Sequence, residues 1–121
     1  MKNETILVFD DDKTLLSIFS IVLKASGYTV AVSETSQDII EKVEEVKPCA
    51  IIMDNWIPTI GGIKATQILK EHDQFRHIPV IYCSANKDIA LLASKAGAEA
   101  YLAKPFDLVD LESTVARLVK N

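Results

Sequence analysis

The sequence is poor in the residues and runs that mark several common classes of protein. It has two cysteines, four glycines, four prolines and one tryptophan in 121 residues. No apolar run approaches the roughly 20 residues that a membrane-spanning helix requires, and the first residues contain no apolar core of a signal peptide. We therefore expect neither a membrane protein nor a secreted, disulfide-rich one, and a cytoplasmic location fits.

Positive charge is also scarce. Lysine and arginine number 13 against 17 aspartates and glutamates, which gives a formal net charge of −4. Nucleic acids and anionic membranes are bound by clustered lysine and arginine, so we expect neither as a direct partner. Apolar residues make up 49% of the chain, which suits one soluble domain with a core over residues 1–121.

Five short apolar runs alternate with five amphipathic segments. Strict alternation of strand and helix indicates a parallel sheet with right-handed crossovers and helices on both faces. The common arrangement is the flavodoxin-like (βα)5 fold with strand order 2-1-3-4-5. The expected strands span residues 5–9, 28–32, 50–54, 80–84 and 100–103, and the expected helices span residues 13–26, 36–46, 62–72, 88–96 and from 107 onward. The last helix is expected to bury Leu108, Leu111, Val115 and Leu118.

Reactive or charged side chains stand where four of these strands end. The apolar central run Ala-Ile-Ile-Met ends in Asp54, and the first strand is followed by Asp10 and Asp11. The fourth strand ends in Ser84, and the fifth is followed by Lys104. Because binding sites of open α/β sheets lie beyond the carboxyl ends of the strands, we expect these five side chains to converge.

The chemistry of this set points to phosphoryl transfer. Three neighbouring carboxylates cannot all stay ionised without a cation, and oxygen ligands without a cysteine–histidine cluster favour Mg²⁺, or Mn²⁺, over zinc. A hydroxyl and an ammonium group suit the stabilisation of charge on a phosphoryl group. A carboxylate can itself accept that group and form an aspartyl phosphate.

These residues, in this order on these elements, resemble the receiver domain of response regulators, the CheY-like phospho-acceptor of two-component signalling. The resemblance runs over residues 5–118. It implies that Asp54 is the phosphorylated residue and that Lys104 pairs with the phosphoryl group. It also implies a metal site in which Asp11 and Asp54 bind Mg²⁺ directly and Asp10 acts mainly through water. The third direct ligand would be the main-chain carbonyl of Trp56.

The same resemblance implies a conformational switch. Ser84 takes the position of the hydroxyl that bonds the phosphoryl group, and Tyr101 takes the position of the aromatic switch residue. Lys104 and Pro105 match a Lys-Pro motif whose peptide bond is usually cis. Trp56 departs from the common pattern because it is large, and a wide indole there is expected to prolong the life of the phosphoryl group.

The implied function is a signalling switch, not an enzyme with a separate substrate. The domain would take its phosphoryl group from the phosphohistidine of a sensor histidine kinase or a histidine phosphotransfer protein. It would catalyse its own phosphorylation and slow dephosphorylation. Helix 13–26 is expected to face the kinase, and helix 88–96, the last strand and the last helix to face a downstream protein. The sequence leaves open whether the domain stands alone or was trimmed from a longer protein.

Two alternative interpretations of the sequence remain. Residues 8–15 also resemble the Asp-x-Asp-x-Thr motif of haloacid-dehalogenase-type phosphohydrolases, with Asp10 as nucleophile and Asp12 as acid/base. That alternative leaves Asp54 without a role, and 121 residues leave no room for a cap domain. The phosphohydrolases also need a further acidic motif after the strand of the lysine, whereas this chain turns into a helix at Phe106. Asp12 is better explained as a helix cap. The second alternative is a pseudo-receiver, a binding module that is never phosphorylated. The presence of every reactive residue type argues against it.

Overall fold

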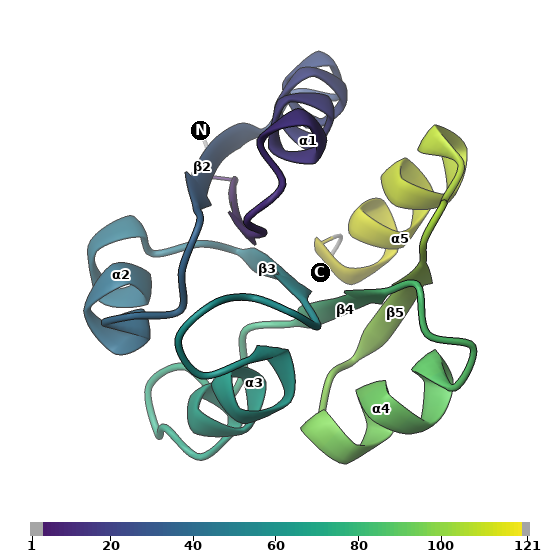
Figure 1. The fold of residues 1–121 in the computed structure, drawn as a ribbon. Helices are drawn as coiled ribbons and strands as arrows, with labels where there is room; N and C mark the ends of the chain where they lie inside the picture. The colour runs from purple at the N-terminus through teal and green to yellow at the C-terminus, as the bar shows by residue number, and fades with distance from the viewer. Residues whose placement is uncertain (1–3, 120–121) are drawn as a thin grey trace.

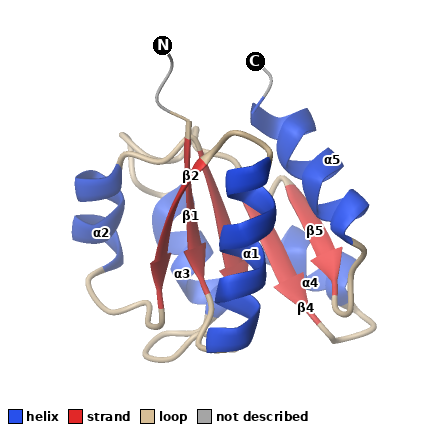
Figure 2. Cartoon of the chain, turned by 90° about the horizontal axis from the view of Figure 1, so that it is seen from above, coloured by secondary structure: helices blue, strands red, loops and turns tan. Residues whose placement is uncertain are grey.

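Five short strands pair into one parallel sheet in the order β2-β1-β3-β4-β5, as the alternation predicts. The structure is a computed structural model, and residues 4–119 are described. All four pairings are parallel, so the strands point the same way and their carboxyl ends meet at one edge (Figure 2). The strands are β1 (Thr5–Phe9), β2 (Thr29–Ser33), β3 (Ala50–Asp54), β4 (Val80–Ser84) and β5 (Ala100–Ala103).

Helices cover both faces of this sheet (Figure 1). On one face lie α1 (Lys13–Ala25) and α5 (Leu108–Val119), and on the other lie α2 (Ile39–Val46), α3 (Gly62–Lys70) and α4 (Ile89–Ala96). This three-layer arrangement confirms the fold class expected from the sequence. None of the helices described in residues 4–119 is long and apolar enough to cross a membrane.

The core explains why the central strands are continuously apolar. Successive side chains of a strand point to opposite faces of the sheet. Ile6 and Val8 of β1 accordingly pack in the cluster with α1 and α5, while Leu7 and Phe9 pack in the cluster with α2 and α3. All residues of β1, β3 and β4 are buried, whereas the edge strands β2 and β5 are partly exposed. A strand covered on both sides has no solvent-facing positions for polar residues.

Local signals fix where the first helix begins and ends. The Asp12 side chain caps α1 by accepting the N–H of Leu15 at 3.1 Å, as expected from the sequence. Gly27, at φ 98°, follows the end of the helix. A positive φ costs glycine little, so this residue lets the chain turn towards β2.

The second helix begins three residues later than expected, at Ile39. Ser36 is buried outside the helix, where its hydroxyl donates to the Pro58 carbonyl at 2.7 Å and accepts the N–H of Ile60 at 2.9 Å. Asp38 adopts a left-handed φ of 56° just before the helix. Ser36 therefore connects two loops, a role that the local helical pattern does not reveal.

The expectation for Leu108 is wrong. Leu111 and Val115 are fully buried on the core side of α5, as predicted, but Leu108 is 49% exposed. Leu108 is the first residue of this helix, so it lies at the rim of the molecule, beyond the carboxyl edge of the sheet. The third helix also ends earlier than expected, at Lys70.

Candidate functional site

Three carboxylates gather at the carboxyl edge of the sheet. Asp10 follows β1, Asp54 ends the neighbouring strand β3, and Asp11 is the next residue after Asp10. One oxygen from each of the three lies within 4.8 Å of the other two. Asp10 and Asp54 are almost fully buried, while Asp11 is exposed. The strand ends therefore converge as the sequence predicts.

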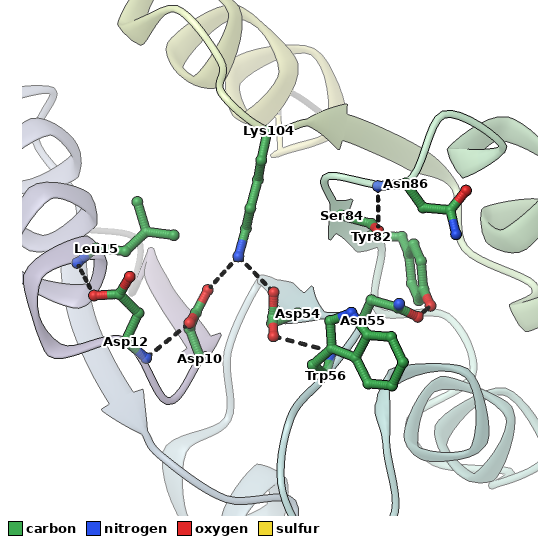
Figure 3. Close-up of polar contacts among 10 residues, drawn as sticks. All are labelled: Asp10, Asp12, Leu15, Asp54, Asn55, Trp56, Tyr82, Ser84, Asn86 and Lys104. Atoms are coloured by element: carbon green, nitrogen blue, oxygen red, sulfur yellow. Dashed lines mark hydrogen bonds and ion pairs between the residues drawn. The ribbon is translucent and has the colours of Figure 1, made fainter.

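Lys104 joins this cluster from the end of β5. Its ammonium nitrogen lies 2.5 Å from Oδ1 of Asp54 and 3.1 Å from Oδ2 of Asp10 (Figure 3). The Lys104 side chain is only 23% exposed, so water screens these two ion pairs less than it would at the open surface. Its main-chain N–H donates to the Ser84 carbonyl at 2.9 Å, and the Lys104–Pro105 peptide bond is cis, as expected.

The pKa values of two of these groups, Asp10 and Lys104, are both raised by their surroundings. Burial raises the pKa of the Asp10 carboxyl above its usual range, and the Asp54 charge adds to this, although the Asp12 N–H and Lys104 oppose it. Burial lowers the pKa of Lys104, but the hydrogen bond and charge of Asp54, together with those of Asp10, outweigh burial and raise that pKa overall. The ammonium group is thus kept protonated between the two carboxylates.

The second oxygen of Asp54 is held by the loop that follows it. The main-chain N–H of Trp56 donates to Oδ2 of Asp54 at 3.0 Å. The Trp56 side chain is 79% exposed, so its indole belongs to the surface around the site. The main chain of Trp56, whose carbonyl is the expected metal ligand, thus lies beside the carboxylate.

The two expected switch residues lie differently. Ser84 is buried at the end of β4, next to β3, and its hydroxyl oxygen accepts the N–H of Asn86 at 3.0 Å. Tyr101 is 47% exposed on the edge strand β5, with β4 between it and the strand of Asp54. The structure therefore places Ser84 beside the cluster and Tyr101 at the surface.

One contact beside Asp54 is not predicted from the sequence. Tyr82 is fully buried in β4, and its hydroxyl donates to the side-chain oxygen of Asn55 (Figure 3). The only signal in the sequence is a hydroxyl-bearing side chain inside an otherwise apolar run. That signal does not identify the partner, because Asn55 lies 27 residues earlier in the chain.

The carboxylate cluster fits a hard divalent cation. The group contains only carboxylate oxygens, with no cysteine or histidine, among the residues that the structure describes. Oxygen-only ligand sets suit Mg²⁺ or Mn²⁺. With its charge between Asp10 and Asp54, Lys104 supplies an ammonium that can pair with an anionic group brought to the same place.

Several known proteins resemble this chain in sequence. A sequence model for the response regulator receiver domain matches residues 6–116. The polar-differentiation response regulator DivK from Brucella anthropi is 28% identical over 114 residues, which cover 93% of each chain. The DNA-binding response regulator MtrA from Mycobacterium tuberculosis is 31% identical over 121 residues, covering 98% of this chain and 52% of MtrA. The chain thus spans about half the length of MtrA.

One solved structure is similar to this chain in both fold and sequence. The receiver domain of a sensor histidine kinase from Pseudomonas aeruginosa, with a magnesium ion coordinated in its active site cleft, superposes with a TM-score of 0.88. It is 26% identical and covers 99% of this chain and 100% of its own.

Proposed function

The chain belongs to the family of response regulator receiver domains, the signalling domains of two-component systems, and on that premise we propose that it is one receiver domain that accepts a phosphoryl group on Asp54. The observation behind this proposal is the ammonium group of Lys104, which lies 2.5 Å from Asp54 and 3.1 Å from Asp10. A phosphoryl group joined to Asp54 would arrive beside a protonated lysine, and this charge would stabilise it.

We further propose that the acidic cluster holds Mg²⁺, or Mn²⁺. Asp10, Asp11 and Asp54 would hold it together with the main-chain carbonyl of Trp56, with Asp10 acting mainly through water. The oxygen-only donor set supports this assignment, as does the magnesium ion in the receiver domain from Pseudomonas aeruginosa. When bound, the cation would neutralise charge on the phosphoryl oxygens.

The residues of the chain would then perform an in-line transfer. A carboxylate oxygen of Asp54 attacks phosphorus, the phosphorus–nitrogen bond to the donor histidine breaks, and the departing imidazole keeps the electron pair and takes up a proton. The Trp56 N–H, 3.0 Å from Oδ2, orients the carboxylate. Lys104 moves its hydrogen bond from the carboxylate to a phosphoryl oxygen. The domain in this way catalyses its own phosphorylation.

The new phosphate would also change the conformation of the domain. The Ser84 oxygen accepts the N–H of Asn86, which leaves the hydroxyl proton to donate to a phosphoryl oxygen. This bond draws the β4–α4 loop inward and biases the exposed Tyr101 towards the interior, a shift between two packings. The face formed by α4, β5 and α5 would present the change to a downstream protein. The donor, a sensor histidine kinase or histidine phosphotransfer protein, would dock on α1.

Small phosphodonors test the acceptor directly. Incubation with acetyl phosphate or phosphoramidate and Mg²⁺ should add one phosphoryl group, measured by intact mass. Asp54→Asn should abolish the addition, and Asp10→Asn should only weaken it. Asp12→Asn is a matched control because asparagine also caps helices, and phosphorylation should persist. Loss of phosphorylation in Asp10→Asn and Asp12→Asn, with retention in Asp54→Asn, would instead indicate the phosphohydrolase chemistry.

A further inference from the structure

Tyr82 carries a hydroxyl group in the interior of β4, where its two neighbours in the strand are apolar. Its neighbours in β4 include Ile81 and Cys83, and the Tyr82 ring is fully buried. A buried hydroxyl that lacks a partner destabilises a fold by about 1–3 kcal/mol. The Tyr82 hydroxyl has a partner, and the partner is the side chain of Asn55, the residue that follows the proposed phospho-acceptor.

Three hydrogen bonds hold Asn55 in place. Its main-chain N–H donates to the Cys83 carbonyl at 2.9 Å, and its own carbonyl accepts the N–H of Gly62 at 3.0 Å. Its side-chain oxygen accepts the Tyr82 hydroxyl. The bonds from Cys83 and Gly62 fix the main chain, and the bond from Tyr82 fixes the side chain.

The position of Asn55 matters because both of its neighbours belong to the site. Asp54 precedes it, and Trp56 follows it with its N–H on Oδ2 of Asp54 at 3.0 Å. Asparagine side chains readily hydrogen-bond to nearby main-chain groups and so compete with existing bonds. Released from Tyr82, the Asn55 amide would be free to compete for main-chain hydrogen bonds in this loop, which includes the Trp56 N–H that holds Oδ2 of Asp54.

We propose that Tyr82 is a positioning residue for phosphoryl transfer, whose buried hydroxyl holds Asn55 and thereby keeps the main chain of Trp56 aligned with Asp54. This inference rests on the proposed function, because it takes Asp54 as the acceptor. Burial, together with the charge of Asp54, raises the pKa of Tyr82 to about 12, so the hydroxyl keeps its proton and remains a donor throughout the neutral range.

Tyr82→Phe tests the role because it removes one oxygen atom and leaves the ring. We expect its rate of phosphorylation by acetyl phosphate to fall about fivefold, equivalent to about 1 kcal/mol, at a temperature where the variant is fully folded. The concentration of Mg²⁺ that half-saturates the Trp56 fluorescence change should rise in parallel. A residue that only stabilises the fold would lower the free energy of unfolding without changing either quantity. Tyr28→Phe, at the opposite edge of the sheet, is the matched control and should match the parent.

A second variant removes the other partner of the hydrogen bond between Tyr82 and Asn55. Asn55→Ala should slow phosphorylation by a similar factor, and the double variant with Tyr82→Phe should be no slower than the slower single variant, since both remove one interaction. Multiplied effects in the double variant would show that the two side chains act independently and would overturn the inference.

The two proposals fail in different ways. If Asp54→Asn still accepts a phosphoryl group, the proposed acceptor is wrong. If Asp54→Asn accepts none, while Tyr82→Phe is phosphorylated at the parent rate with the parent dependence on Mg²⁺, the acceptor stands and only the role of Tyr82 is overturned.

Discussion

Gly62 approaches Asp54 so closely that a side chain would not fit between them. A Cβ atom on Gly62 would lie 2.4 Å from the main-chain oxygen of Asp54 and 2.9 Å from the Cα of Asn55. The first turn of α3 therefore packs directly on the main chain of the acceptor strand. Both nearest atoms belong to the main chain, so neither can move aside as a flexible side chain would.

Gly62→Ala is expected to destabilise the protein by about 1–3 kcal/mol, the usual cost of overpacking. The higher helix propensity of alanine favours the variant by up to about 1 kcal/mol and offsets part of this loss. Urea unfolding followed by circular dichroism measures the difference. Lys64→Ala, at an exposed position of the same helix, is the control and should change stability little. If Gly62→Ala is as stable as the parent, the main chain at the end of β3 moves aside at little cost in free energy.

Mg²⁺ should bind in the absence of phosphate and change the fluorescence of Trp56, the only tryptophan. Titration should give a saturable change that excess chelator reverses, because the proposed carbonyl ligand belongs to that residue. Asp11→Asn should remove the change, since it replaces a charged oxygen ligand by a neutral one. An identical titration in Asp11→Asn would mean that the exposed acid takes no part in metal binding.

The aspartyl phosphate should be long-lived for a receiver domain. Hydrolysis needs a water in line behind phosphorus. From the resemblance to receiver domains, we expect Trp56, two residues after the acceptor, and Asn86, two residues after Ser84, to flank its approach. A wide indole can shield this path, and a tenfold slower loss requires only about 1.4 kcal/mol of barrier. We expect Trp56→Asn to lose phosphate faster once the donor is removed, with decay followed by intact mass. Because the indole is 79% exposed, the substitution should leave stability nearly unchanged.

If Trp56→Asn decays at the parent rate, the indole does not shield the phosphoryl group. Its exposure beside the site would then favour a role in partner contact, since tryptophan often anchors protein interfaces. Binding of a phosphohistidine donor protein to the same variant would separate the two roles.

Stability should fall at alkaline pH partly through Tyr82. Burial and the Asp54 charge raise its pKa from 10.0 to about 12. Between these values the unfolded state has released a proton that the folded state retains, so the free energy of unfolding decreases as pH rises. Tyr82→Phe lacks this group and should lose stability less steeply between pH 10 and pH 12, measured by urea unfolding at several pH values. Equal slopes for parent and variant would contradict the raised pKa.

The sequence by itself determined the architecture and which side chains lie together at the carboxyl edge of the sheet. Continuous apolar runs specify strands covered on both faces, and their alternation with helical stripes favours the common sheet order that the structure shows. Because parallel strands end at one edge, the order of residues along the chain already grouped Asp10, Asp54 and Lys104. These inferences need only the local periodicity of apolar residues and the general right-handedness of β-α-β crossovers. Neither depends on a contact between particular residues far apart in the chain.

Only the tertiary structure decided which atoms meet. Lys104 bonds Asp10 across 94 residues, Tyr82 bonds Asn55 across 27, and Ser36 bonds Pro58 across 22. Such contacts depend on the distances between elements after packing, and a local pattern of apolar and polar residues does not encode those distances. The same reason explains two of the departures from expectation. Ser36 bonds a remote loop and is not part of α2, and Leu108 lies at the rim, where the sheet does not cover it.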